Sequence, residues 1–269
     1  MVKFYRKTVS FSALWVSTND RLSDFYASSW QREESVVPML VVRLLLTISS
    51  LGILTWSLVE DANPYWLIYL TNWGILLVSA TTMSGVVVSF AFLVKKPLET
   101  TNLAWYVSFY WVAFNIALAI SIMITILYWI LLHDPAIPEK YGLRGYWLNI
   151  SKHGLMSCII VTELLFSRTP VRLAHLYQPL GVGLLYALFS VIYFAAGGTD
   201  NEGHEFIYAV LNWREPRNAG IIVICSVSAL VVLYVMLWMV AFLRDKLSTA
   251  LMRTKTNDLP LSTCDITVL

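Results

Sequence analysis

The sequence is poor in charge and in cysteine, and both shortages restrict the class of protein. Only 13% of its 269 residues are Asp, Glu, Lys or Arg, about half the share in a soluble globular domain. Its three cysteines are too few for the disulfide framework of a small secreted scaffold. The net charge is only +2, and no run of five basic residues occurs, so no nucleic-acid partner is expected.

Sequence motifs of the common enzyme classes are also missing. There is no glycine-rich phosphate loop, no Gly-x-Ser-x-Gly elbow and no His-Glu-x-x-His helix. The stretch from Asp200 to Glu205 is rich in potential metal ligands. They stand side by side rather than at the spacing of known metal sites, which favours a solvated loop. The sequence therefore predicts neither a metal nor a cofactor.

Apolar residues, in contrast, are abundant and gathered in long runs. They make up 58% of the chain, which predicts an integral membrane protein. Because backbone hydrogen bonds must close within each segment in lipid, the runs predict helices, and an all-α fold of six transmembrane helices. The six predicted spans are Pro38–Val59, Tyr65–Val94, Leu103–Leu132, Tyr146–Phe166, Leu176–Ala196 and Ala219–Leu243.

The distribution of Lys and Arg predicts which way the bundle sits. Most of them lie in the two tails and in the second and fourth connections, so the positive-inside rule places both termini in the cytoplasm. The chain then divides into a cytoplasmic tail (1–37) with the interfacial aromatics Phe25, Tyr26 and Trp30, a transmembrane domain (38–243) and a cytoplasmic tail (244–269). The membrane is predicted to be the plasma membrane or an endomembrane.

Polar residues inside predicted spans are the candidates for function. Thr71 and His153 both follow the extracytoplasmic start of their spans by six or seven residues, at a depth of about 9–11 Å. At 100° per residue, Thr71 shares a stripe of small residues with Gly74, predicted to face other helices. Asn149, one turn before His153, is a candidate to orient the ring or bind a substrate oxygen. A purely structural role for these residues is the alternative.

Three charged residues also fall inside the predicted spans. We expect Arg43 to snorkel to lipid head groups from the cytoplasmic end of its helix, and Lys152 to reach the outer interface in the same way. Glu163 lies deep in the fourth span, where it is expected to be protonated or capped by a neighbour.

Several of these segments resemble the rolling stone family of multi-pass membrane proteins, known for a part in insect myoblast fusion. The likeness extends from about Trp30 to the sixth span. The matching runs are Tyr69–Gly74, Lys152–Gly154, Thr169–Arg172, Tyr193–Asp200 and Ile207–Trp213.

More distantly, the chain resembles the androgen-induced and androgen-dependent membrane hydrolases, which split fatty acid esters of hydroxy fatty acids with an intramembrane threonine and histidine. The resemblance implies that Thr71 and His153 are catalytic and that Asn72 and Asn149 bind substrate. The sequence departs from that pattern at Asn72-Trp73, where the hydrolases carry apolar residues. It departs again at Lys152 and Met156, which replace an asparagine and a second histidine.

Two functions of different class follow. In the first, the protein is a lipid-ester hydrolase in which Thr71 attacks the ester and His153 moves the proton. In the second, it is a non-enzymatic membrane organiser or cell-fusion factor. Its partners would be membrane lipids and, through the terminal Thr267-Val268-Leu269, a PDZ domain.

Overall fold

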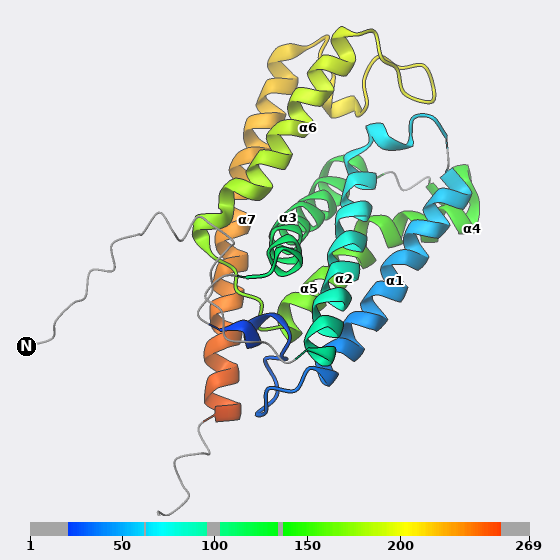
Figure 1. Cartoon of the computed structure of the whole chain (residues 1–269). Coiled ribbons are helices and arrows are strands. Elements are labelled where there is room, and N and C mark those ends of the chain that lie inside the picture. Colours follow the sequence, from blue (N-terminus) through cyan, green and yellow to red (C-terminus); the bar gives the residue numbers. More distant parts are fainter. Residues whose placement is uncertain (1–20, 62, 96–102, 134–136, 254–269) are drawn as a thin grey trace, which may run out of the picture.

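The structure, a computed structural model, describes residues 21–61, 63–95, 103–133 and 137–253. Over these ranges the chain is helical and contains no β-strand; Ser28 and Ser167 form an isolated antiparallel bridge. The predicted all-α class is therefore confirmed. The helices lie side by side in a bundle, with the connection between α6 and α7 at one end and residues 21–36 at the other (Figure 1).

In the part of the chain that the structure describes, five helices are long and apolar enough to cross a membrane by length and composition. They confirm the positions of five of the six predicted spans. The count of six and the side of each terminus stay predictions. The five are α1 (Val37–Asp61), α2 (Leu70–Val94), α3 (Trp105–Leu127, prolonged by a π-helical turn to Leu132), α6 (Tyr177–Ala195) and α7 (Pro216–Ser248, prolonged to Arg253).

The remaining predicted span, Tyr146–Phe166, is built from three pieces rather than one regular helix. They are the end of α4 (Ile137–Ile150), a π-helical segment (Ser151–Leu155) and α5 (Met156–Phe166). Gly142 has a φ of +66° inside α4, a conformation that glycine adopts without steric cost and that breaks the helix. A π-helical segment widens the backbone locally and is frequent at functional sites.

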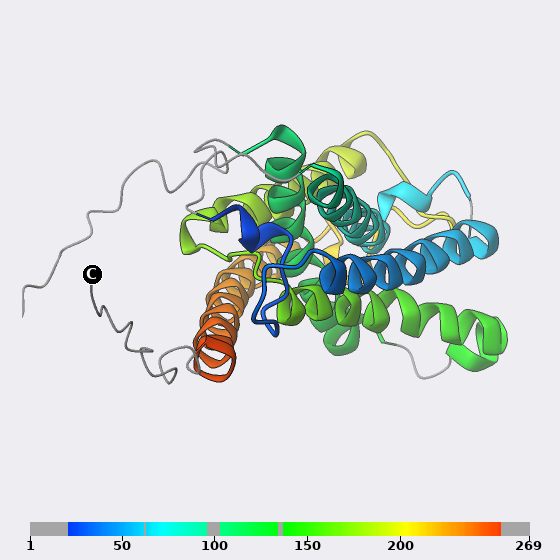
Figure 2. The ribbon, with the colours of Figure 1, turned by 60° about the horizontal axis from the view of Figure 1, so that its bottom comes forward.

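The two central helices are α2 and α3. Half of the apolar window of each is buried, against about a fifth for α1, α6 and α7. From Leu230 onward, the buried residues of the outer helix α7 recur every three or four positions, so they share one face. They are Leu230, Tyr234, Leu237, Ala241, Arg244 and Ser248. The remaining faces of α1, α6 and α7 carry exposed Leu, Ile and Val, as lipid-facing helices do. Figure 2 shows α1 and α7 on the outside of the bundle.

Residues 21–36 pack against the bundle at the end opposite the α6–α7 connection (Figures 1 and 2). A short 3₁₀ turn (Leu22–Phe25) carries Phe25, which is fully buried with its ring 5.1 Å from that of Trp111. The Ser29 amide donates to the Phe166 carbonyl at 2.8 Å, and Arg168 Nε donates to the Ser28 carbonyl at 2.8 Å. The described part of the predicted N-terminal tail is thus integrated with the helical core.

Candidate functional site

The predicted candidate Thr71 lies in the first turn of α2, and 9% of its surface is exposed. The hydroxyl of Tyr208 lies beside the Thr71 hydroxyl and the backbone amides of Leu70 and Thr71. Those amides belong to the helix N-terminus, where the first N–H groups have no partner within the helix. Burial raises the pKa of Tyr208 above its ordinary value, although the interactions with Thr71 lower it in part.

Other aromatic residues surround the start of α2. Tyr186 of α6 donates its hydroxyl hydrogen to the Ile68 carbonyl at 2.9 Å, and the rings of Tyr69 and Tyr208 meet edge to face at 5.8 Å. Asn72, predicted to bind substrate, donates its side-chain N–H to the Trp66 carbonyl at 2.6 Å. That hydrogen bond holds the short 3₁₀ turn Trp66–Ile68 against the helix.

The second predicted candidate, His153, lies in the π-helical segment and is 9% exposed. Its ring stacks on that of Tyr128, with centroids 3.7 Å apart and planes 5° from parallel. Its Nδ1 is buried and has no hydrogen-bond partner, and the same is true of Oδ1 of Asn149, one turn earlier. Buried polar atoms without a hydrogen-bond partner are rare in folded proteins, and a functional role is one reason for them.

The structure brings the two candidates to the same part of the bundle without joining them. The π-helical segment packs against α2. Within the described residues, however, Thr71 has Tyr208 beside it while His153 lies against Tyr128. No hydrogen bond between Thr71 and His153 is found in this part of the chain. A catalytic pairing of the two therefore stays a prediction.

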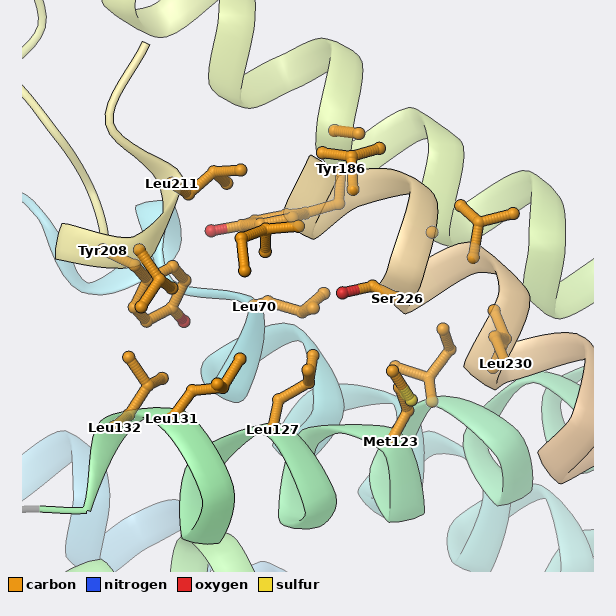
Figure 3. Close-up of a pocket in the computed structure, with 17 residues that line it drawn as sticks. Leu70, Met123, Leu127, Leu131, Leu132, Tyr186, Tyr208, Leu211, Ser226 and Leu230 are labelled. Carbon is orange, nitrogen blue, oxygen red and sulfur yellow. The ribbon is translucent and has the colours of Figure 1, made fainter. Parts of the chain in front are cut away.

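An apolar pocket of about 120 Å³ lies between α3, α6 and α7 and reaches Leu70 at the start of α2 (Figure 3). Its wall is made almost entirely of apolar atoms, and Tyr186, Tyr208 and Ser226 are among the residues that line it. Tyr208 connects the pocket to Thr71, because it borders the pocket and lies beside the Thr71 hydroxyl.

A second polar centre, which the sequence reasoning missed, lies in the core nearer the opposite end. Arg43 is fully buried rather than snorkelling, so that expectation is wrong. Its Nη2 lies 2.9 Å from Oε1 of Glu163 and 2.7 Å from the Tyr110 hydroxyl. Glu163 is capped by a neighbour, as expected. The pairing of Arg43 with Glu163 could have been predicted from their opposite charges, because a cation inside a membrane protein requires an anion nearby.

The rest of the Arg43 guanidinium is also satisfied. Nη1 donates to the Phe25 carbonyl at 2.8 Å, to Ser89 Oγ at 2.8 Å and to the Gly85 carbonyl at 3.1 Å. These partners come from the N-terminal segment and from α2, so one side chain links several parts of the core. Lys152 pairs with Asp61, a half-exposed residue at the end of α1, and its predicted reach to the outer interface stays a prediction.

Together, the long apolar helices, their lipid-facing surfaces and the pocket between them define a multi-pass membrane protein with an all-helical core. Comparison with known proteins gives the family. The family model described as "Protein rolling stone" matches residues 1–257, so the chain belongs to the rolling stone family. It is similar to Protein rolling stone of Drosophila melanogaster, at 26% identity over 233 residues, covering 83% of this chain and 82% of that one. No solved structure matches.

Proposed function

We propose that this rolling stone family member is a lipid-ester hydrolase with six transmembrane spans and both termini in the cytoplasm. That topology places Thr71 and His153 toward the extracytoplasmic side of the plasma membrane or an endomembrane. The substrate class, by resemblance, is fatty acid esters of hydroxy fatty acids. The observation that carries the proposal is the buried imidazole of His153, whose Nδ1 lacks a partner on a π-helical segment that packs against α2.

The chemistry follows from the side chains. Thr71 Oγ1 attacks the ester carbon while His153 takes the hydroxyl proton, and the protonated ring then gives that proton to the leaving alcohol. Water hydrolyses the resulting acyl-threonine with His153 again as base, which frees the fatty acid and restores both residues. Asn149 is the better candidate to stabilise the oxyanion, because the Asn72 amide is engaged with the Trp66 carbonyl.

The test uses purified full-length protein, a lipid-ester substrate and a fluorescent fluorophosphonate that labels active serine or threonine hydroxyls. Thr71→Ala and His153→Ala should each lower kcat by about 100-fold or more, and Thr71→Ala should abolish labelling. Thr81→Ala is the matched control. Thr81 lies buried on the same helix and donates its hydroxyl hydrogen to the Leu77 carbonyl at 2.7 Å. Labelling that persists in Thr71→Ala contradicts the proposal.

A second candidate function is that of a non-enzymatic membrane organiser or myoblast-fusion factor. It is favoured by the position of Thr71 beside Tyr208, which ties the α6–α7 connection to α2 in the manner of a structural contact. It expects Thr71→Ala to keep full activity in a cell-fusion assay. Thr267-Val268-Leu269 lies outside the described residues, and its proposed binding to a PDZ domain is tested by deleting the three residues.

A further inference from the structure

We propose that Oδ1 of Asn149 and Nδ1 of His153 together hold the water molecule that hydrolyses the acyl-threonine intermediate. Each atom accepts one hydrogen of that water, which leaves the lone pairs of the water oxygen free to attack the acyl carbon. The proposed function supplies the intermediate, so this assignment rests on it. It adds the position of the second nucleophile and a role for the Asn149 carbonyl oxygen.

Two buried polar atoms lie one helical turn apart on the same segment of the chain. Among the described residues, neither Oδ1 of Asn149 nor Nδ1 of His153 has a hydrogen-bond partner. In a helix, residues four apart have Cβ atoms about 5–6 Å from each other, and each of these two atoms lies only a short distance beyond its Cβ. One water molecule spans a gap of this size and satisfies both atoms.

The other polar groups near these atoms are already engaged. Ser151 donates its hydroxyl hydrogen to the Trp147 carbonyl at 2.8 Å, and Lys152 pairs with Asp61 of α1. The Tyr128 ring covers one face of the imidazole, with its plane 5° from parallel. A ring stacked in this way does not bond to Nδ1, because the lone pair of that nitrogen lies in the plane of the imidazole. Nδ1 therefore depends on a partner other than these side chains.

A water held at these two atoms is arranged for attack. An amide oxygen only accepts hydrogen bonds, and a neutral imidazole accepts at the nitrogen without a hydrogen, so the two side chains take up both hydrogens of the water. As the water oxygen attacks the acyl carbon, one O–H bond breaks and its proton passes to Nδ1. The bond from the acyl carbon to Thr71 Oγ1 then breaks, and the proton passes from the ring to Oγ1. The fatty acid leaves, and Thr71 and His153 are restored.

The two ends of the Asn149 amide thus have separate tasks, with Nδ2 at the oxyanion and Oδ1 at the water. Water reaches this position from the polar end of α1. Lys152, next to His153, pairs with Asp61, and the side chains of this pair are 11% and 45% exposed. An ion pair that reaches the surface beside an otherwise apolar segment provides the polar surroundings that an internal water requires.

The experiment measures how the acyl-enzyme divides between two nucleophiles. Purified full-length protein is incubated with a lipid ester and a fixed concentration of hydroxylamine, and the fatty acid and the hydroxamic acid are quantified by mass spectrometry. Both products come from one intermediate, so a variant that folds poorly or acylates slowly makes less of each without changing their ratio. Asn149→Leu should raise the ratio of hydroxamic acid to fatty acid at least about threefold, the effect of one hydrogen bond to the water.

Two matched variants decide which atom is responsible. Asn149→Asp keeps an acceptor oxygen and loses the amide hydrogens, so it should keep the wild-type ratio. Ser151→Ala removes a hydroxyl of the same segment that is already bonded to the Trp147 carbonyl, and it should also keep that ratio. A ratio that is unchanged in Asn149→Leu, or raised to the same extent in Asn149→Asp, overturns the assignment.

Failure of the proposed function gives a different result. Hydroxamic acid formed with Thr71→Ala comes from the direct reaction of hydroxylamine with the ester and is subtracted as background. A wild type that then forms neither product is no hydrolase, which overturns the proposed function and the water site with it. A wild type that forms both products, in a ratio that Asn149→Leu leaves unchanged, keeps the hydrolase and overturns the water site alone.

Discussion

Arg43 of α1 and Glu163 of α5 form an ion pair inside the helical core, with side chains only 0% and 1% exposed. Around it, Tyr110 of α3 donates its hydroxyl hydrogen to Glu163 and lies 3.0 Å from Thr169 Oγ1. A buried ion pair is costly to desolvate and repays that cost only when additional hydrogen bonds surround it. Each guanidinium nitrogen of Arg43 has an acceptor, whereas Oε2 of Glu163 is buried and has no hydrogen-bond partner among the described residues.

Removal of one partner of this pair should destabilise the protein strongly. Glu163→Gln leaves the buried guanidinium without its counter-charge and should lower the free energy of unfolding by about 3–5 kcal/mol, measured by denaturation in detergent. The double variant Arg43→Met/Glu163→Leu should lose less than Glu163→Gln, because no uncompensated charge remains. Glu205→Gln is the control, since its ion pair with Arg214 lies on the surface, and it should change stability little. A Glu163→Gln protein as stable as the wild type contradicts the prediction.

A glycine beside Arg43 should be intolerant of a methyl group. A Cβ atom at Gly85 lies 3.2 Å from Cδ and Nε of Arg43 and 3.2 Å from the ring of Tyr110. Gly85→Ala should therefore displace the guanidinium and cost about 1–3 kcal/mol of unfolding free energy. Gly52→Ala, in α1 with nothing within 4 Å, should be neutral or stabilising by up to about 1 kcal/mol. The measurement is the melting temperature of each variant, which should fall for Gly85→Ala and not for Gly52→Ala. Equal shifts would refute the expectation.

The attachment of residues 21–36 should depend on Arg168. This side chain donates to the Ser28 carbonyl and, at 2.8 Å, to the Gln31 carbonyl. Arg168→Ala removes both bonds and should accelerate hydrogen exchange at the Ser29 amide by at least about tenfold. Arg144→Ala is the control. Arg144 is largely exposed, and its ion pair with Glu60 is long, at 3.9 Å from Nη1 to Oε1. Unchanged exchange in Arg168→Ala shows that other contacts hold the segment.

The turn around Asp200 should open in acid. Burial raises the pKa of Asp200, but hydrogen bonds from the His204 ring and from the amides of His204 and Glu202 outweigh it, so the pKa lies below its ordinary value. A carboxylate with a lowered pKa contributes stability above its unfolded pKa of about 4 and loses it as the pH falls through the folded value. Exchange at the Glu202 and His204 amides, corrected for intrinsic rates, should stay constant from about pH 7 to 5 and rise below about pH 4.

The variant Asp200→Asn checks the cause of this acid response. It cannot ionise, so the turn should be loosened already at neutral pH, and the exchange rates should no longer change with acidity. An Asp200→Asn protein that still opens below about pH 4 assigns the response to another group.

The membrane helices and the buried stripe of α2 follow from the sequence, because both depend on local properties. Hydropathy over some 20 residues decides whether a helix stays in lipid. The 3.6-residue period decides which residues share a face. Thr71 and Gly74, which the period places on that stripe, are both buried in the structure.

Only part of the break within the fourth predicted span follows from local sequence. The left-handed conformation of Gly142 requires a residue without Cβ, but a glycine alone does not say that a helix will break there. The π-helical segment at Ser151–Leu155 has no pattern in the sequence that we recognise.

The sequence by itself determined an all-helical membrane protein and placed Thr71 and His153 among buried polar groups. Only the tertiary structure decided the partners: Tyr208 beside Thr71, Tyr128 against His153 and Glu163 paired with Arg43. The reason is physical. Hydropathy and helical period act within one helix, whereas the neighbour of a buried polar side chain depends on how helices distant in the sequence pack and on which charge or hydroxyl that packing brings within hydrogen-bonding distance.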